Sequence, residues 1–187
     1  MDPKILIAIV AVIVVIAVVA MVIFSQRRKL ALRQRFGPEY ERAVKERGSE
    51  RAAQSVLAER ERRVSKFNIR DLSETEREQY AEHWRKVQAR FVDDPRGAVN
   101  DADESVGLLM GTRGYPMTDF DQRAADLSVD HPRVVENYRA AHAIALRHRA
   151  GQASTEDLRQ AMIHYRSLFE DLLDGHRPGE TRTREVA

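Results

Sequence analysis

Two short stretches of the chain hold the side chains best suited to chemistry, residues 113–116 and 126–132. They flank one short connection, so in a helical domain both are expected to lie in one region. A guanidinium, two carboxylates and an imidazole placed there could form hydrogen bonds and ion pairs with a ligand or a partner. The candidate interaction residues are Arg113, Tyr115, Pro116, Asp126, Asp130 and His131.

The rules of turns and helix ends also explain most of these residue types. Gly114 is suited to ending a helix, and Asp130 or His131 is suited to capping a helix that begins at Pro132. Tyr115 is expected to fold over the core. We therefore favour turn chemistry for this region. A ligand-binding or enzymatic bundle that uses residues 113–131 is the alternative.

Other patterns that indicate catalysis or metal binding are missing from the sequence. The chain contains no cysteine, and no two of its six histidines stand four residues apart, the spacing that lets two imidazoles bind one ion from a helix face. The G-x-S-x-G motif of a serine nucleophile and a glycine-rich phosphate loop are also missing. We therefore expect no metal, no cofactor and no enzymatic activity.

The most distinctive element of the chain is an apolar run at residues 5–24, which contains no charged side chain. In hydrocarbon every backbone N–H must be paired within the segment, which selects a helix, and 20 residues give about 30 Å, one hydrocarbon thickness. The run therefore predicts a single transmembrane helix that acts as a signal anchor. A cleaved signal peptide followed by export is the alternative, but the run is long and its start is only weakly basic.

Positive charge follows the apolar run. Five basic side chains lie close behind it: Arg27, Arg28, Lys29, Arg33 and Arg35. Before the run there are only Asp2 and Lys4. This asymmetry predicts that the rest of the chain stays in the cytoplasm and that the five cations contact lipid headgroups. Residues 36–187 carry 28 acidic and 25 basic side chains, a net charge of −3, so we expect no nucleic-acid partner.

Beyond residue 35, apolar residues recur three and four positions apart, without strand-like alternation. The sequence predicts an all-α protein with an N-terminal transmembrane helix, linker helices and a small four-helix-type bundle. The expected domains are a membrane anchor with a basic juxtamembrane segment (1–35), charged linker helices (36–72), the bundle (73–174) and a disordered tail (175–187). The linker helix near 49–66 has a thin apolar side, which favours a solvated linker over half of a coiled-coil-like pair.

Capping residues predict where the bundle helices begin. Ser73 and Glu76 form a capping-box pattern, while Asp94 and Ser154 are suited to capping two later helices. The last helix has the clearest apolar stripe, made of Leu158, Met162, Tyr165, Leu168, Phe169 and Leu172.

Four motifs also carry a resemblance: RFGPEY at 35–40, RGYP at 113–116, DLSVDHP at 126–132 and NYR at 137–139. Through them nearly the whole chain resembles a widespread family of uncharacterised bacterial single-pass membrane proteins. That family carries no assigned activity, cofactor or catalytic residue. The resemblance therefore implies a bacterial anchor in the inner (plasma) membrane and no specific chemistry.

Together these features predict a membrane-anchored helical interaction or scaffold module. Its expected partners are the lipid bilayer, through residues 5–24, and a second protein.

Overall fold

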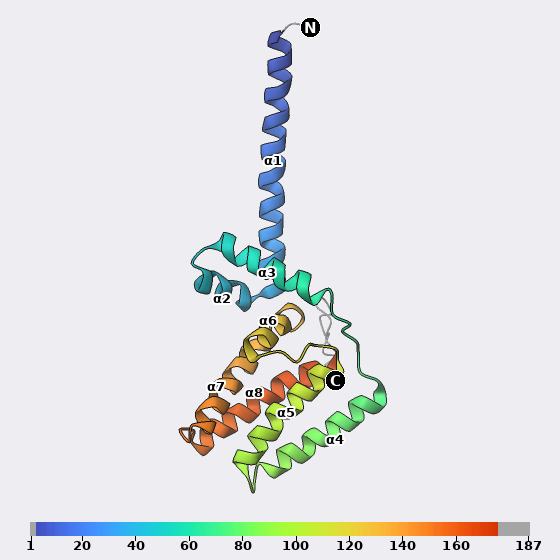
Figure 1. Cartoon of the computed structure of the whole chain (residues 1–187), viewed down its shortest axis with the longest axis vertical. Coiled ribbons are helices and arrows are strands. Elements are labelled where there is room, and N and C mark those ends of the chain that lie inside the picture. Colours follow the sequence, from blue (N-terminus) through green and yellow to red (C-terminus); the bar gives the residue numbers. More distant parts are fainter. Residues whose placement is uncertain (1–2, 176–187) are drawn as a thin grey trace, which may run out of the picture. The chain divides into compact units, whose positions relative to one another are not determined.

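The structure, a computed structural model, describes the backbone of residues 3–175 and the side chains from residue 12 onward. This part of the chain contains eight helices and no strand, which confirms the predicted all-α fold (Figure 1). The helices are α1 (Pro3–Phe36), α2 (Pro38–Arg47), α3 (Glu50–Val64), α4 (Glu74–Arg90), α5 (Pro95–Thr112), α6 (Phe120–Asp130), α7 (Val135–Arg149) and α8 (Thr155–Asp174).

The chain divides into two compact units, Met1–Leu57 and Ala58–Ala187. The division falls inside α3. The predicted four-part organisation rests on composition and stays a prediction. The disordered tail predicted for 175–187 lies, from residue 176 onward, outside the described residues.

The first unit consists of α1, α2 and the first half of α3. Gly37 separates α1 from α2 with a φ of 49°, and Pro38 begins α2, where its missing N–H costs no helical hydrogen bond. The end of α1 contacts α2, and Leu32 and Phe36 near this end are both buried. Among the described residues, no helix combines the length and the hydrophobicity that crossing a bilayer requires.

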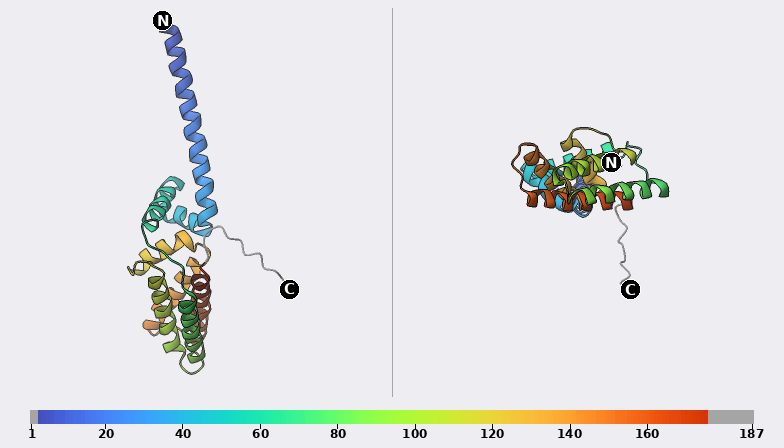
Figure 2. Two further views of the ribbon diagram at one scale, coloured as in Figure 1. Left: turned by 90° about the vertical axis from the view of Figure 1, so that its right-hand side faces the viewer. Right: turned by 90° about the horizontal axis from the view of Figure 1, so that it is seen from below.

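The second unit is a helical bundle. α4, α5, α7 and α8 pack around one core, and α6 packs against α7. Figure 2 shows α4, α5 and α8 alongside one another in two further views. The six predicted stripe residues of α8 are all buried, which confirms that stripe. The only tryptophan of the chain, Trp84, stacks on Phe169 with ring centroids 4.4 Å apart.

Three helix starts follow the predicted caps. Ser73 forms a complete capping box with Glu76, and Ser154 forms one with Asp157. The Asp94 carboxylate accepts the backbone N–H of Gly97. These bonds satisfy donors that the first turn of a helix otherwise leaves unpaired.

The predicted start of α7 is wrong. α7 begins at Val135 and not at Pro132, so neither Asp130 nor His131 caps it. Asp130 is instead the last residue of α6, and the backbone N–H of His131 donates to the Leu127 carbonyl at 2.8 Å. This bond continues the hydrogen-bond pattern of α6 up to the turn that precedes α7. Pro132 therefore lies in the turn between the two helices.

The second half of α3 and the segment after it belong to the bundle unit. Ala58 and Val64 are buried, and the Arg63 side chain bonds to α6. This half of the helix therefore packs on one face, unlike the solvated linker that its composition favours. The chain beyond it crosses the end of α5, where the Arg70 N–H donates to the Arg113 carbonyl at 2.9 Å.

Gly114 is required at the point where the segment after α3 crosses the end of α5. Its φ is +96°, and a Cβ at this position would lie 2.3 Å from the carbonyl oxygen of Asn68. We expect Gly114→Ala to lower the free energy of unfolding by about 3 kcal/mol, because both the backbone conformation and the close approach oppose a side chain. Urea unfolding followed through Trp84 fluorescence measures this loss.

Gly151 provides the matched control for that substitution. It has a φ of +72° but open space around the Cβ position. Gly151→Ala should therefore cost only about 1 kcal/mol, from the backbone conformation alone. Equal losses for the two variants would contradict the role given to the crossing at Asn68.

Candidate functional site

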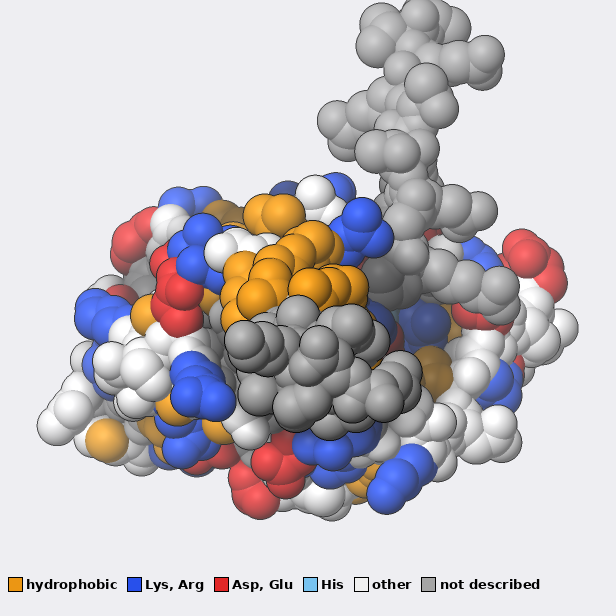
Figure 3. Space-filling view, turned by 90° about the horizontal axis from the view of Figure 1, so that it is seen from above, with side chains coloured by type: hydrophobic (Ala, Val, Ile, Leu, Met, Phe, Trp, Pro, Cys, Tyr) orange, Lys and Arg blue, Asp and Glu red, His pale blue; other side chains and the backbone are white. Residues whose placement is uncertain are grey.

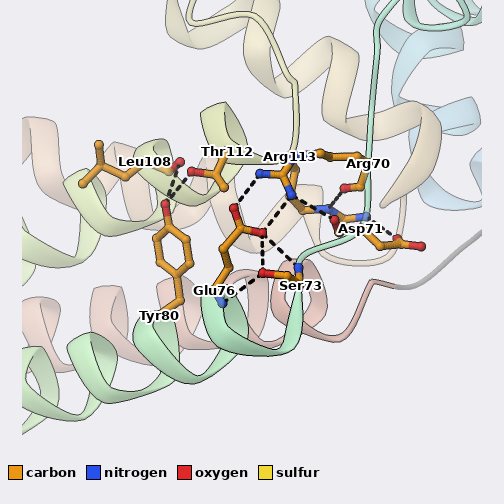
Figure 4. A network of polar contacts seen from close by, with 8 residues as sticks. All are labelled: Arg70, Asp71, Ser73, Glu76, Tyr80, Leu108, Thr112 and Arg113. Carbon is orange, nitrogen blue, oxygen red and sulfur yellow. Dashed lines mark hydrogen bonds and ion pairs between the residues drawn. The ribbon is translucent and has the colours of Figure 1, made fainter.

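Arg113 lies at the centre of a polar network at the end of α5 (Figure 4). Its side chain is buried, and Nη1 donates to the carbonyl oxygen of Leu172 at 2.8 Å. Nε donates to the Arg70 carbonyl at 3.4 Å, and Nη2 lies 3.6 Å from the Asp71 carboxylate. Leu172 belongs to the last turn of α8, whose carbonyls have no partner within the helix. Arg113 thus joins α8, α5 and the segment before α4.

The same network continues to the surface at the start of α4. Arg70 donates two hydrogen bonds to Glu76, at 2.6 and 2.8 Å. Arg70, followed by the backbone and hydroxyl of Ser73, lowers the pKa of Glu76 to about 2. Further along α4, the Tyr80 hydroxyl lies 2.6 Å from the Thr112 hydroxyl (Figure 4). These contacts hold α4 and its preceding segment on α5.

A second cluster joins the ends of α5, α6 and α8. The Tyr115 hydroxyl donates to the Asp130 carboxylate at 3.1 Å. Nδ1 of His131 donates to the carboxylate of Asp171 on α8. Tyr115 and His131 are both buried, and their ring centroids lie 6.2 Å apart. The Tyr115 hydroxyl and Nδ1 of His131 are therefore both directed at other parts of the fold.

The electrostatics of Tyr115 agree with a donor role. Burial, followed by the charge of Asp130, raises the pKa of the Tyr115 hydroxyl well above its usual range. The positive charge of the nearby Arg113 lowers the same pKa, but by less. The hydroxyl therefore stays protonated and serves as a hydrogen-bond donor, not as a base.

The six candidate interaction residues do not form one site. Arg113, Tyr115, Asp130 and His131 lie in two neighbouring networks. Asp126 is buried and makes its own contacts. Its carboxylate accepts from Arg63 at 2.7 Å and from Gln122 at 2.9 Å. Pro116 is half-buried in the connection before α6.

The sequence prediction did not include the partners of these residues. Asp171 pairs with His131 across 40 residues, and Arg63 pairs with Asp126 across 63. Asp71 and the Leu172 carbonyl complete the surroundings of Arg113. Tertiary packing alone brings these pairs together, so no local spacing in the sequence indicates them.

One serine and one histidine meet in the bundle. Nε2 of His83 lies 2.9 Å from the Ser105 hydroxyl oxygen, and that hydroxyl donates to the Asp101 carbonyl at 2.6 Å. Ser105 is fully buried. A nucleophile must reach its substrate, so this pair stabilises the α4–α5 contact and does not have the geometry of a catalytic dyad. Among the described residues there is also no group of three metal-ligating side chains.

The predicted lipid-contact residues lie in the first unit and fall into different environments. Lys29 and Arg33 form ion pairs with Glu50 at the start of α3. Arg27 and Arg28 are exposed and form no ion pair with any residue that the structure describes. Arg35 is also exposed.

Comparison with family models, characterised proteins and solved structures found no match to this chain. The family resemblance carried by the four motifs therefore stays a prediction.

Variants of His131 test the role of the second cluster. His131→Leu removes the donor to Asp171, and we expect it to lower the free energy of unfolding by about 1–3 kcal/mol. His131→Asn keeps an N–H donor near the position of Nδ1, so its cost should be clearly smaller. Thermal unfolding monitored by circular dichroism measures both. If His131→Asn costs as much as His131→Leu, the bond to Asp171 is not what holds His131.

Proposed function

We propose that this protein is a membrane-anchored helical interaction or scaffold module, held in the bilayer by the apolar run at residues 5–24. The observation that carries the proposal is the surface of α1. Every large hydrophobic side chain described between Val12 and Phe24 exposes 50–70% of its surface. Figure 3 shows hydrophobic side chains gathered in one continuous group over this helix.

An apolar surface of this extent is unfavourable in water. A helix that is hydrophobic on all sides is stable when it is covered by protein or by lipid. Residues 12–24 supply 13 of the 20 positions of the run, and residues 5–11 continue the same composition in the sequence. The full run has the length that matches the hydrocarbon thickness of a bilayer.

The charges that follow the run give the orientation. Basic residues beyond the run and almost none before it favour a cytoplasmic location for the rest of the chain, at the inner membrane of a bacterium. The motif resemblance supports a bacterial single-pass anchor, and the orientation depends on the charges alone. Export after cleavage of the run would give the opposite location.

The buried polar side chains of the bundle support an interaction role for its outer surface, because they make contacts inside the fold. Arg113, Tyr115 and His131 are directed into contacts between helices. Those contacts stabilise the fold and leave the outer surface as the part that meets a partner protein. The proposed module therefore acts by placing that surface at the membrane.

Fractionation of cells that express the full chain tests the anchor. After an alkaline wash the chain should remain in the membrane fraction at its full mass. The double variant Val15→Glu/Val18→Glu should move to the soluble fraction, because two carboxylates in the run oppose insertion. Recovery of the unmodified chain in the soluble fraction, or a shortened chain, would overturn the anchor.

A fused reporter tests the orientation. A reporter that is active only in the cytoplasm, fused after Ala187, should give a signal. Activity only from a reporter that requires export would reverse the proposed topology.

A further inference from the structure

The basic segment after the apolar run has two different faces. Lys29, Leu32, Arg33 and Phe36 follow the spacing of i, i+3, i+4 and i+7, so they share one side of α1. Leu32 and Phe36 are buried on this side. Arg27 lies on the opposite side of the helix, and Arg28, four positions before Leu32, lies at the edge of the buried side; both side chains are exposed. The five cations therefore do not act as one uniform patch.

The side of α1 that carries Lys29 and Arg33, the inner face, makes its contacts within the first unit. Nζ of Lys29 and Nη2 of Arg33 lie 2.5 and 3.5 Å from the Glu50 carboxylate. Arg33 also lies 3.2 Å from Glu41, and its guanidinium stands over the ring of Tyr40, 5.1 Å from the centroid. The hydrogen bond from Lys29 is the largest cause of a lowered Glu50 pKa, so this carboxylate stays charged and keeps its partners.

The outer face, formed by Arg27 and Arg28, is exposed, and in the proposed anchored state it would lie at headgroup depth. Arg27 and Arg28 follow the last apolar residue, Phe24, by three and four positions. At about 1.5 Å per residue this places them about 5–6 Å beyond the end of the run. A guanidinium binds phosphate oxygens through two parallel hydrogen bonds, which suits the phosphate of a lipid headgroup.

We propose that Arg27 and Arg28 form a site for anionic phospholipid headgroups, while Lys29 and Arg33 hold α3 on α1. This inference rests on the proposed membrane anchor and assigns different tasks to cations that are close neighbours in the sequence. Charge complementarity supports it, because the inner pair already has carboxylate partners and the outer pair has none among the described residues.

The test compares two double variants that remove the same number of charges, Arg27→Gln/Arg28→Gln and Lys29→Gln/Arg33→Gln. The full chain is reconstituted in phosphatidylcholine vesicles. The association of spin-labelled phosphatidylglycerol, relative to spin-labelled phosphatidylcholine, is then measured by electron paramagnetic resonance. We expect the unmodified chain to prefer phosphatidylglycerol. Removal of Arg27 and Arg28 should reduce this preference by up to roughly 5-fold for each residue.

The matched variant Lys29→Gln/Arg33→Gln should keep most of the preference. Its effect should instead appear as faster hydrogen exchange of the α3 amides, because α3 loses its ion pairs with α1. Equal loss of lipid preference in the two double variants, or no preference in the unmodified chain, would overturn the inference. Failure of the unmodified chain to insert into vesicles would instead overturn the membrane anchor itself.

Discussion

Replacement of Leu168 with aspartate is expected to unfold the bundle. Leu168 is fully buried on α8, within the apolar stripe that packs against the other bundle helices. A carboxylate in that position loses its hydration and gains no partner, at a cost of several kcal/mol. The total stability of a domain is about 5–15 kcal/mol, so this single change removes a large share of it.

Ile163→Asp is the control for this prediction. Ile163 lies on the same helix, but this residue is 37% exposed, so the new carboxylate can reach water. Both variants place the same residue inside α8, so their helix propensities differ only by the small difference between leucine and isoleucine. Thermal unfolding followed by circular dichroism and by Trp84 fluorescence should show a native-like Ile163→Asp protein and a largely unfolded Leu168→Asp protein. A melting curve of Leu168→Asp that matches the parent would remove this stripe from the core.

The α8 stripe and the three confirmed caps were predictable because their signals are local. A stripe such as Leu158, Met162 and Tyr165 follows from the 3.6-residue period alone. A cap depends on one side chain and the next three residues, as in Ser73 with Glu76. Neither signal requires knowledge of what the helix packs against.

The beginning of α7 was mispredicted because two local rules agreed on a start at Pro132 and tertiary packing overrode both. Pro132 is well suited to a first helical position, and Asp130 before it resembles a cap. Both rules were overridden when α6 continued to Asp130 and His131 turned inward to Asp171. A buried contact with a residue 40 positions away decided the local structure here, and a single sequence does not reveal such a contact.

In the structure Arg113, Asp130 and His131 lie at the ends of α5 and α6, but their roles were only partly predictable from the sequence. Turn chemistry accounts for Gly114, whose φ is positive. It does not account for Arg113, a long charged side chain that is only 3% exposed. Burial of a guanidinium requires partners on several elements, and those partners become visible only in the folded chain.

Arg113→Met is expected to be among the most damaging of the proposed changes. Methionine fills part of the space of the arginine stem but has no donors. The Leu172 carbonyl then loses the hydrogen bond that Nη1 supplies at 2.8 Å, and the Arg70 carbonyl loses its bond to Nε. A buried polar group left without a partner costs about 1–3 kcal/mol. We therefore expect a loss of about 2–4 kcal/mol in the free energy of unfolding.

The matched change Arg159→Met separates burial from charge in this prediction. Arg159 forms two hydrogen bonds with Glu156, both 2.7 Å long, but the pair is exposed on the surface of α8. Exposed pairs contribute at most about 1 kcal/mol, so Arg159→Met should be nearly neutral. Urea unfolding through Trp84 fluorescence gives both values. If the two variants lose equal stability, the Arg113 contacts contribute no more than a surface ion pair, and Arg113 would again become a candidate for binding a partner.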